Sequence, residues 1–161
     1  MDTFTLSSPA FEDGGMMPSR YTCDGENINP PLRWEGAPEG TASFALLVDD
    51  PDIPQEVKAR FGIEKWDHWV LYNIAPGTAA IAEGDAPGEE GLNSSGAPGY
   101  QGPCPPPQYE PREHRYVFRL LALDTMLSVP ADEAPTYAMI EKLAEGHVRA
   151  EARLVGRYRR E

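Results

Sequence analysis

Residues 114–123, HRYVFRLLAL, form the stretch that decides the fold of this chain. After a polar start the stretch becomes strongly apolar, and Tyr116, Phe118 and Leu120 follow one another at every second position. Side chains at positions i and i+2 of a β-strand share a face, so this spacing predicts a strand with the three residues on one side. The same rule places His114 beside Tyr116, where the strand begins.

Two other stretches predict further strands. Residues 43–48, SFALLV, form a nearly continuous apolar run that is typical of a strand buried on both faces. The strand is expected to end before Pro51, because proline pushes the preceding residue into an extended conformation. Residues 68–74, HWVLYNI, again begin with a histidine after a polar loop and then turn apolar. The histidines that open two of these strands are therefore expected to line a common rim.

The C-terminal region changes its period. Apolar residues between Tyr137 and Val148 follow helical spacing, and Pro135 is well placed at the start of a helix. From Val148 to Tyr158 apolar residues alternate with charged ones, mostly arginine and glutamate. We expect a short helix followed by an edge strand, whose charged face discourages pairing with another chain.

Seventeen prolines and fifteen glycines punctuate the chain. Proline lacks an amide donor and glycine tolerates unusual dihedral angles, so their clusters separate short strands and do not lie inside helices. No internal repeat or change of composition marks a second domain, and 161 residues are about the length of one domain. The sequence predicts a mainly β protein with long loops, forming a single domain over residues 1–161.

The net charge of -12 excludes some partners. Such a chain lacks the cations whose binding releases counterions from nucleic acid, and it is repelled by anionic membranes. No stretch approaches the roughly 18 apolar residues of a membrane helix, so membrane insertion is not expected. The N-terminus lacks the basic start and apolar run of a secretion signal, which predicts a cytoplasmic location. A small anion can still bind where local dipoles and a few cationic groups overcome the long-range field.

The two cysteines, Cys23 and Cys104, lie far apart in the sequence and lack metal-type spacing. In a cytoplasmic protein such cysteines are expected to remain reduced thiols. A single disulfide between them stays open at this point.

Polar residues with chemical potential gather in four short segments. They are DPDIP at 50–54, WDHW at 66–69, GYQGPCPP at 99–106 and HRY at 114–116. In this order they resemble the phosphatidylethanolamine-binding protein family, whose DPDxP, HW-x-x-x-N-I, Y-x-G-P-x-PP and HRY-x-F elements all occur here. The stretches YTCDG at 21–25 and PPLRW at 30–34 are similar to the bacterial YbhB/YbcL branch, also called Raf kinase inhibitor-like. The resemblance extends from Phe11 to Arg159.

This resemblance implies a core of antiparallel β-sheet or sandwich, one or two short helices near the C-terminus, and a pocket at the strand ends. The expected ligand is phosphate, acetate or a phospho-headgroup, and no cofactor is implied. The residues expected to contact the ligand are Asp50, Trp66, His68, Gly102, Cys104, His114 and Tyr116. Those expected to support the loops are Asp52, Tyr100, Pro103 and Pro105.

The chemistry of such a pocket is consistent with the residue types. Two protonated imidazoles donate hydrogen bonds, a nearby carboxylate favours their charged form, and the Tyr116 hydroxyl adds a donor. Gly102 is expected to let the backbone approach closely and offer amides to the anion. Asp50 would repel an anion directly, so its expected role is to orient and charge a histidine. The mixed-charge stretch 55–65 could border the pocket and alter what fits.

Other interpretations remain at this stage. Each histidine could simply cap a strand, and the aromatic residues could serve packing alone. A hydrolase could use Cys104 and His114 as nucleophile and base, or His68 and Asp50 as base and orienting residue. A metal site could combine Asp50, Asp52, His68 and His114. The sequence favours a binding protein without enzyme activity or metal. It does not identify the physiological ligand, a regulated or inhibited partner protein, or a homodimer interface.

Overall fold

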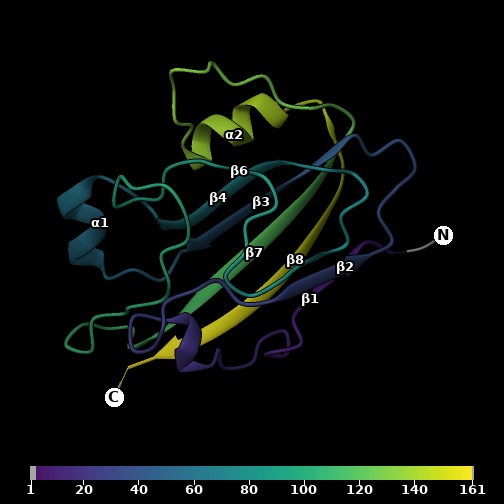
Figure 1. The fold of residues 1–161 in the computed structure, drawn as a ribbon. Helices are drawn as coiled ribbons and strands as arrows, with labels where there is room; N and C mark the ends of the chain where they lie inside the picture. The colour runs from purple at the N-terminus through teal and green to yellow at the C-terminus, as the bar shows by residue number, and fades with distance from the viewer. Residues whose placement is uncertain (1–2, 161) are drawn as a thin grey trace.

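The computed structural model describes residues 3–160, and its centre is a five-stranded sheet built mainly of long strands (Figure 1). The strand order is β6-β4-β3-β7-β8, and every neighbouring pair is antiparallel. The bounds are Ser43–Asp50 for β3, Trp66–Ile74 for β4, Glu89–Glu90 for β6, Glu113–Leu123 for β7 and Val148–Arg159 for β8. The mainly β, antiparallel core predicted above is therefore confirmed, and β8 is an outer strand of this sheet.

A smaller sheet packs against one face of the large one. It has the order β1-β2-β5, with β1 at Thr5–Ser7, β2 at Leu32–Glu35 and β5 at Ala80–Ile81. Large side chains fill the space between the two sheets, and Trp34 meets Phe44 edge to face with ring centroids 5.4 Å apart. This layer forms the larger of the two hydrophobic clusters of the core.

Helix α2, Tyr137–Ala144, covers the opposite face of the large sheet (Figure 1). Its buried side chains pack on residues of β3, β4 and β7 such as Leu47, Val70 and Leu121. Because β3 is covered on both faces, all eight of its residues are buried, as its continuous apolar run predicted. The helix begins two positions after Pro135, since the Thr136 hydroxyl accepts from the Met139 amide and acts as the N-cap.

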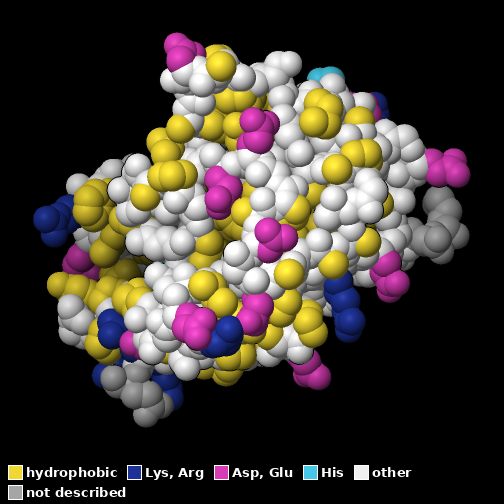
Figure 2. Space-filling view, viewed as in Figure 1, with side chains coloured by type: hydrophobic (Ala, Val, Ile, Leu, Met, Phe, Trp, Pro, Cys, Tyr) yellow, Lys and Arg dark blue, Asp and Glu magenta, His cyan; other side chains and the backbone are white. Residues whose placement is uncertain are grey.

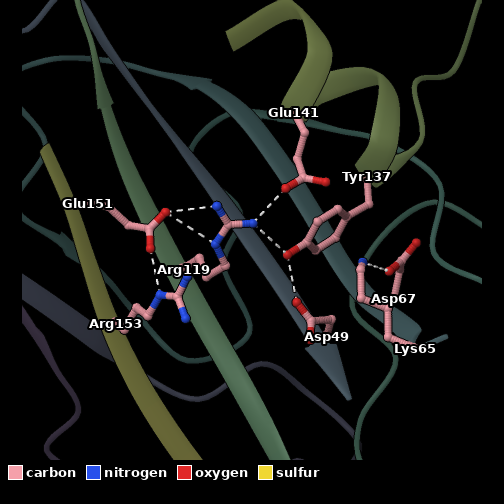
Figure 3. A network of polar contacts seen from close by, with 8 residues as sticks. All are labelled: Asp49, Lys65, Asp67, Arg119, Tyr137, Glu141, Glu151 and Arg153. Carbon is pink, nitrogen blue, oxygen red and sulfur yellow. Dashed lines mark hydrogen bonds and ion pairs between the residues drawn. The ribbon is translucent and has the colours of Figure 1, made fainter. Parts of the chain in front are cut away.

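A polar network fastens α2 to the sheet (Figure 3). The Tyr137 hydroxyl donates to Asp49 Oδ2 at 2.6 Å and accepts from Arg119, which also pairs with Glu141 and Glu151. Lys65 lies over the Tyr137 ring, 3.1 Å from its centroid. Burial raises the pKa of the Asp49 carboxyl above its usual range. The network thus stabilises one end of β3 on the face that carries α2.

The structure also contains a helix that was not predicted, in the mixed-charge stretch 55–65. Helix α1, Gln55–Phe61, is the next element after β3. Like the other helices of residues 3–160, it is not long and apolar enough to cross a membrane. Pro54 stands at its N-cap, and Gly62 ends it in the left-handed conformation with φ of 64°. These two residues were the signal for the helix. A single 3-10 turn, Ser19–Tyr21, precedes β2.

Candidate functional site

A cavity of about 290 Å³ opens where β3 ends and β4 and β7 begin, beside α1 and the loop 101–106. Its position follows from the antiparallel order, which brings the end of β3 next to the starts of β4 and β7. All of the residues expected to contact a ligand line it: Asp50, Trp66, His68, Gly102, Cys104, His114 and Tyr116. Of the residues expected to support the loops, only Pro105 lines the cavity.

A register shift in the sheet turns His68 toward the cavity. Val48 pairs with Trp69, but the next residue of β3, Asp49, pairs with Asp67, so His68 is the extra residue of a β-bulge. Strict alternation would put His68 on the face of Val70, under α2. Its ring lies instead against Tyr116 on the other face, with centroids 5.1 Å apart.

His68 has one occupied and one free ring nitrogen. Nδ1 lies 2.5 Å from the carbonyl oxygen of Gln101, and because a carbonyl only accepts, Nδ1 carries the hydrogen. No hydrogen-bond partner for Nε2 is found within residues 3–160. Burial lowers the pKa of His68, although the Gln101 carbonyl and the Asp50 carboxylate act in the opposite direction. In the unliganded protein Nε2 is therefore an unprotonated acceptor near neutral pH.

His114 is engaged on both sides. Its Nδ1 lies 2.6 Å from Asp50 Oδ2, and its Nε2 lies 3.0 Å from the carbonyl oxygen of Pro111. Both neighbours are acceptors, so an imidazolium with hydrogens on both nitrogens fits this position. The expectation that both histidines donate to a ligand is therefore wrong in part, because His114 has no free nitrogen. Asp50 orients His114, as its repulsion of anions suggested.

Tyr116 has a hydroxyl without a protein partner. Its ring is stacked with His114 at 6.3 Å and contacts His68 edge to face, while only 1% of the residue is exposed. The buried oxygen makes no hydrogen bond in the described part of the chain. Burial raises the pKa of Tyr116, so the hydroxyl keeps its hydrogen. It is a donor without an acceptor among the described residues.

Gly102 plays a different role from the one expected. Its amide donates to Asn27 Oδ1 at 2.8 Å, so it is not offered to a ligand. A Cβ atom at this position would lie 2.4 Å from the Tyr21 carbonyl oxygen and 2.3 Å from Asn27 Oδ1. Glycine is therefore required for the close approach of the loop to residues 21–27, and this positions the cavity wall.

The two cysteines form a disulfide, with Cα atoms 5.4 Å apart. The expectation of reduced thiols is wrong, because the fold brings Cys23 and Cys104 together although 81 positions separate them. The Cys23 amide also donates to the Pro103 carbonyl at 3.1 Å, so the same contact supports the loop twice. A reducing compartment keeps most thiols reduced, and the cytoplasmic location stays a prediction.

The other loop residues tie the segments around the cavity together. Asp52 accepts from the Arg115 amide and pairs with the Arg115 guanidinium, both at 2.8 Å, and this guanidinium lowers the pKa of Asp52. The Asp52 amide in turn donates to Asp50 Oδ1 at 2.7 Å. Tyr100 donates to the Tyr21 carbonyl and packs against Trp69.

The alternative sites find little support in this arrangement. Cys104 has no free thiol to act as a nucleophile. Asp50 pairs with His114, so the proposed base and orienting residue of a His68 hydrolase are not joined by a hydrogen bond. Within residues 3–160 no group of three or more His, Cys, Asp or Glu side chains could hold a metal ion.

Sequence reasoning missed part of the lining. Gln101 holds His68 through its carbonyl and accepts from Trp66 Nε1 at 2.9 Å through its side chain. Gln101 lies in the proline-rich segment 99–106, and no role was predicted for it. Val57 and Phe61 of α1 also line the cavity, and their i, i+4 spacing after Pro54 was the available signal.

Comparison with known proteins agrees with this fold. Residues 7–159 match the family described as phosphatidylethanolamine-binding protein. A UPF0098 protein of Methanothermobacter thermautotrophicus is 46% identical over 162 residues, covering 96% of this chain and 98% of that one. A UPF0098 protein of Chlamydia pneumoniae is 42% identical, covering 95% and 97% of the two chains.

Solved structures of this family have the same fold as the chain. A phosphatidylethanolamine-binding protein homologue of Chlamydia trachomatis superposes with a TM-score of 0.90 at 36% identity, covering the whole of both chains. Escherichia coli YbcL, described as a member of the mammalian PEBP family, superposes with a TM-score of 0.83 at 27% identity, covering 98% and 99%. The chain belongs to the phosphatidylethanolamine-binding protein family.

Proposed function

We propose that this protein binds a small acidic group, a phosphate, a carboxylate such as acetate or a phospho-headgroup, in the cavity at the strand ends. The observation that carries the proposal is the pair formed by the buried, unpartnered Tyr116 hydroxyl and the free Nε2 of His68. A buried hydroxyl without a partner costs roughly 1–3 kcal/mol. A ligand oxygen in the cavity would remove this cost.

The residues proposed to act at the site fall into three groups. His68 and Tyr116 contact the acid directly, while Asp50 and His114 form the charged wall behind them. Trp66, Gly102 and Cys104 shape the cavity. Their roles follow from position and from the bonds described above, with Gly102 acting through close packing of the backbone.

Charge sets a condition on binding. Among the described residues no Lys or Arg lines the cavity, and His68 is neutral in the unliganded protein. Asp49, Asp50 and Asp67 are the carboxylates that favour its protonated form. An anion would add to their effect and draw a proton onto Nε2, where it becomes a second donor beside Tyr116. Binding should therefore strengthen as the pH falls from 8 to 6.

Inorganic phosphate and acetate are suitable probes of this proposal. Each should raise the melting temperature of the protein at millimolar concentration, and more at pH 6 than at pH 8. Nitrogen-detected NMR of the imidazoles should report a protonated His68 in the complex. Absence of any shift at both pH values, with ligand up to high millimolar concentration, would remove the basis of the proposal. A role in regulating or inhibiting a partner protein, and a homodimer, remain further proposals that this experiment does not address.

A further inference from the structure

The residues that line the cavity include a polar group and an apolar group, called here its polar end and its apolar end. The polar end is formed by His68 and Tyr116 at the strand termini. The apolar end is formed by Val57 and Phe61 of α1, together with Trp66. A ligand that filled both ends would carry its acid at the strands and an apolar group against the helix.

The apolar end has hydrophobic surface without a partner. Helix α1 buries none of its side chains, and Phe61 is 55% exposed. The Phe61 ring meets Trp66 edge to face at 5.9 Å, and Trp66 is held in place by its bond to Gln101. Hydrophobic side chains gather on the surface beside α1, at the left of Figure 2. An apolar occupant would cover this surface.

The volume of the cavity sets the size of that occupant. An apolar cavity of about 150 Å³ holds one benzene molecule, and a water molecule takes about 30 Å³. The 290 Å³ measured here therefore accommodates an acid group and one ring-sized substituent. Inorganic phosphate or acetate alone would leave the α1 wall in contact with water, while long acyl chains would extend beyond the cavity.

The polar end also has little to offer a positively charged substituent. Asp50 is the one carboxylate among the described lining residues. Its Oδ1 accepts from the Asp52 amide and its Oδ2 from His114. An ammonium group such as that of ethanolamine would therefore find no unpaired anion. An uncharged apolar substituent suits the remaining space better.

Resting on the function proposed above, we infer that the acid bound here is carried on a ring-sized apolar group seated between α1 and Trp66, and that Phe61 with Val57 selects it. The expected ligands are phosphate monoesters of aromatic alcohols and aromatic carboxylic acids. Phenyl phosphate is the simplest phosphate probe of this class. The strand-end residues recognise the acid, and the helix recognises the substituent.

Calorimetric titration of the full chain with three probes tests this inference. Phenyl phosphate should bind at least about tenfold more tightly than inorganic phosphate, because burial of apolar surface adds roughly fourfold per buried CH₂ equivalent. Phosphoethanolamine should bind no more tightly than phosphate. Phe61→Ala should weaken phenyl phosphate binding by roughly five- to tenfold while leaving phosphate within about twofold. Val57→Ala should act in the same direction, and Ala59→Ser, on the exposed side of the same helix, should change neither.

The outcomes separate the two proposals. If phosphate binds but phenyl phosphate binds no more tightly, or if Phe61→Ala weakens both probes equally, the inference about α1 is overturned and the acid site stands. Tighter binding of phosphoethanolamine than of phenyl phosphate also overturns it. If none of the three acids binds, the acid site itself is refuted and the inference with it. Circular dichroism of each variant confirms that the fold is retained.

Discussion

Asp50 Oδ2 and His114 Nδ1 lie 2.6 Å apart at the base of the cavity, with only 4% and 1% of their side chains exposed. Asp49, the preceding residue, points its carboxylate to the other face of the sheet and accepts from Tyr137 (Figure 3). The carboxylates of two consecutive residues of β3 thus make contacts on opposite faces of the sheet. The end of β3 is fixed by polar contacts on both sides, which holds the wall of the candidate site in place.

Breaking the Asp50–His114 pair should cost stability. Asp50→Asn removes one partner of a buried acid–imidazole contact, and such a loss costs about 3 kcal/mol of unfolding free energy. Asp52→Asn is the matched control, because its partner Arg115 is half exposed, and it should cost only about 1 kcal/mol. Urea unfolding of the two variants measures both values. Equal costs would show that the buried pair adds nothing special.

The Tyr116 hydroxyl should matter for the ligand and not for the fold. Tyr116→Phe removes a buried group that has no protein partner, so the unliganded protein should be as stable as before or more stable, by up to about 3 kcal/mol. Phosphate affinity should fall roughly tenfold. Tyr137→Phe removes a hydroxyl bonded to Asp49 and Arg119; it should lower stability and leave phosphate binding unchanged. The opposite pattern would contradict the assignment.

His68 should make the unliganded protein less stable as the pH falls. Burial lowers its pKa in the folded state below the usual value near 6.5, so the unfolded chain binds more protons as the pH drops through this value. Stability is then lost between the usual pKa and the lowered one. Unfolding in phosphate-free buffer from pH 8 to pH 5 should show a steeper decline for the wild type than for His68→Gln. Parallel curves would mean that His68 titrates alike in both states.

Gly102 should tolerate no side chain. In Gly102→Ala the added Cβ would lie 2.4 Å from the Tyr21 carbonyl oxygen, and overpacking of this kind costs about 1–3 kcal/mol. A Cβ added at Gly77 would meet no atom within 4 Å, so Gly77→Ala should be neutral or slightly stabilising. Melting temperatures of the pair decide the matter, and similar values would indicate that the loop can move away.

Removing the disulfide should destabilise the protein as a whole. The bridge closes a loop of 81 positions, for which the loss of chain entropy in the unfolded state corresponds to about 4–5 kcal/mol. The Cys23→Ser/Cys104→Ser variant should lose this amount in urea unfolding, and dithiothreitol should lower the wild type toward the variant without affecting the variant itself. A variant as stable as the oxidised wild type would contradict this expectation.

Local patterns in the sequence predicted the four long strands β3, β4, β7 and β8, but not β6 or the smaller sheet. Each pattern reflects which faces of a strand are buried, and residues close together in the sequence report this directly. The patterns are the apolar run of β3, the two-residue spacing of Tyr116, Phe118 and Leu120 in β7, and the alternation in β8. The C-terminal helix was also predicted from a local pattern, the helical spacing of its apolar residues. The short helix α1 was missed because its seven residues bury no side chain and show only Pro54 and Gly62 as boundary signals.

What the sequence alone determined was the antiparallel β class, through residue patterns and family resemblance, and the set of residues that gather at one end of the sheet. The tertiary structure decided what each residue does there. The bulge that turns His68 toward Tyr116, the occupation of both His114 nitrogens, the use of the Gly102 amide by Asn27 and the joining of Cys23 to Cys104 all depend on contacts between distant segments. Spacing along the chain carries no information about such contacts, because they arise only when separate strands and loops pack together.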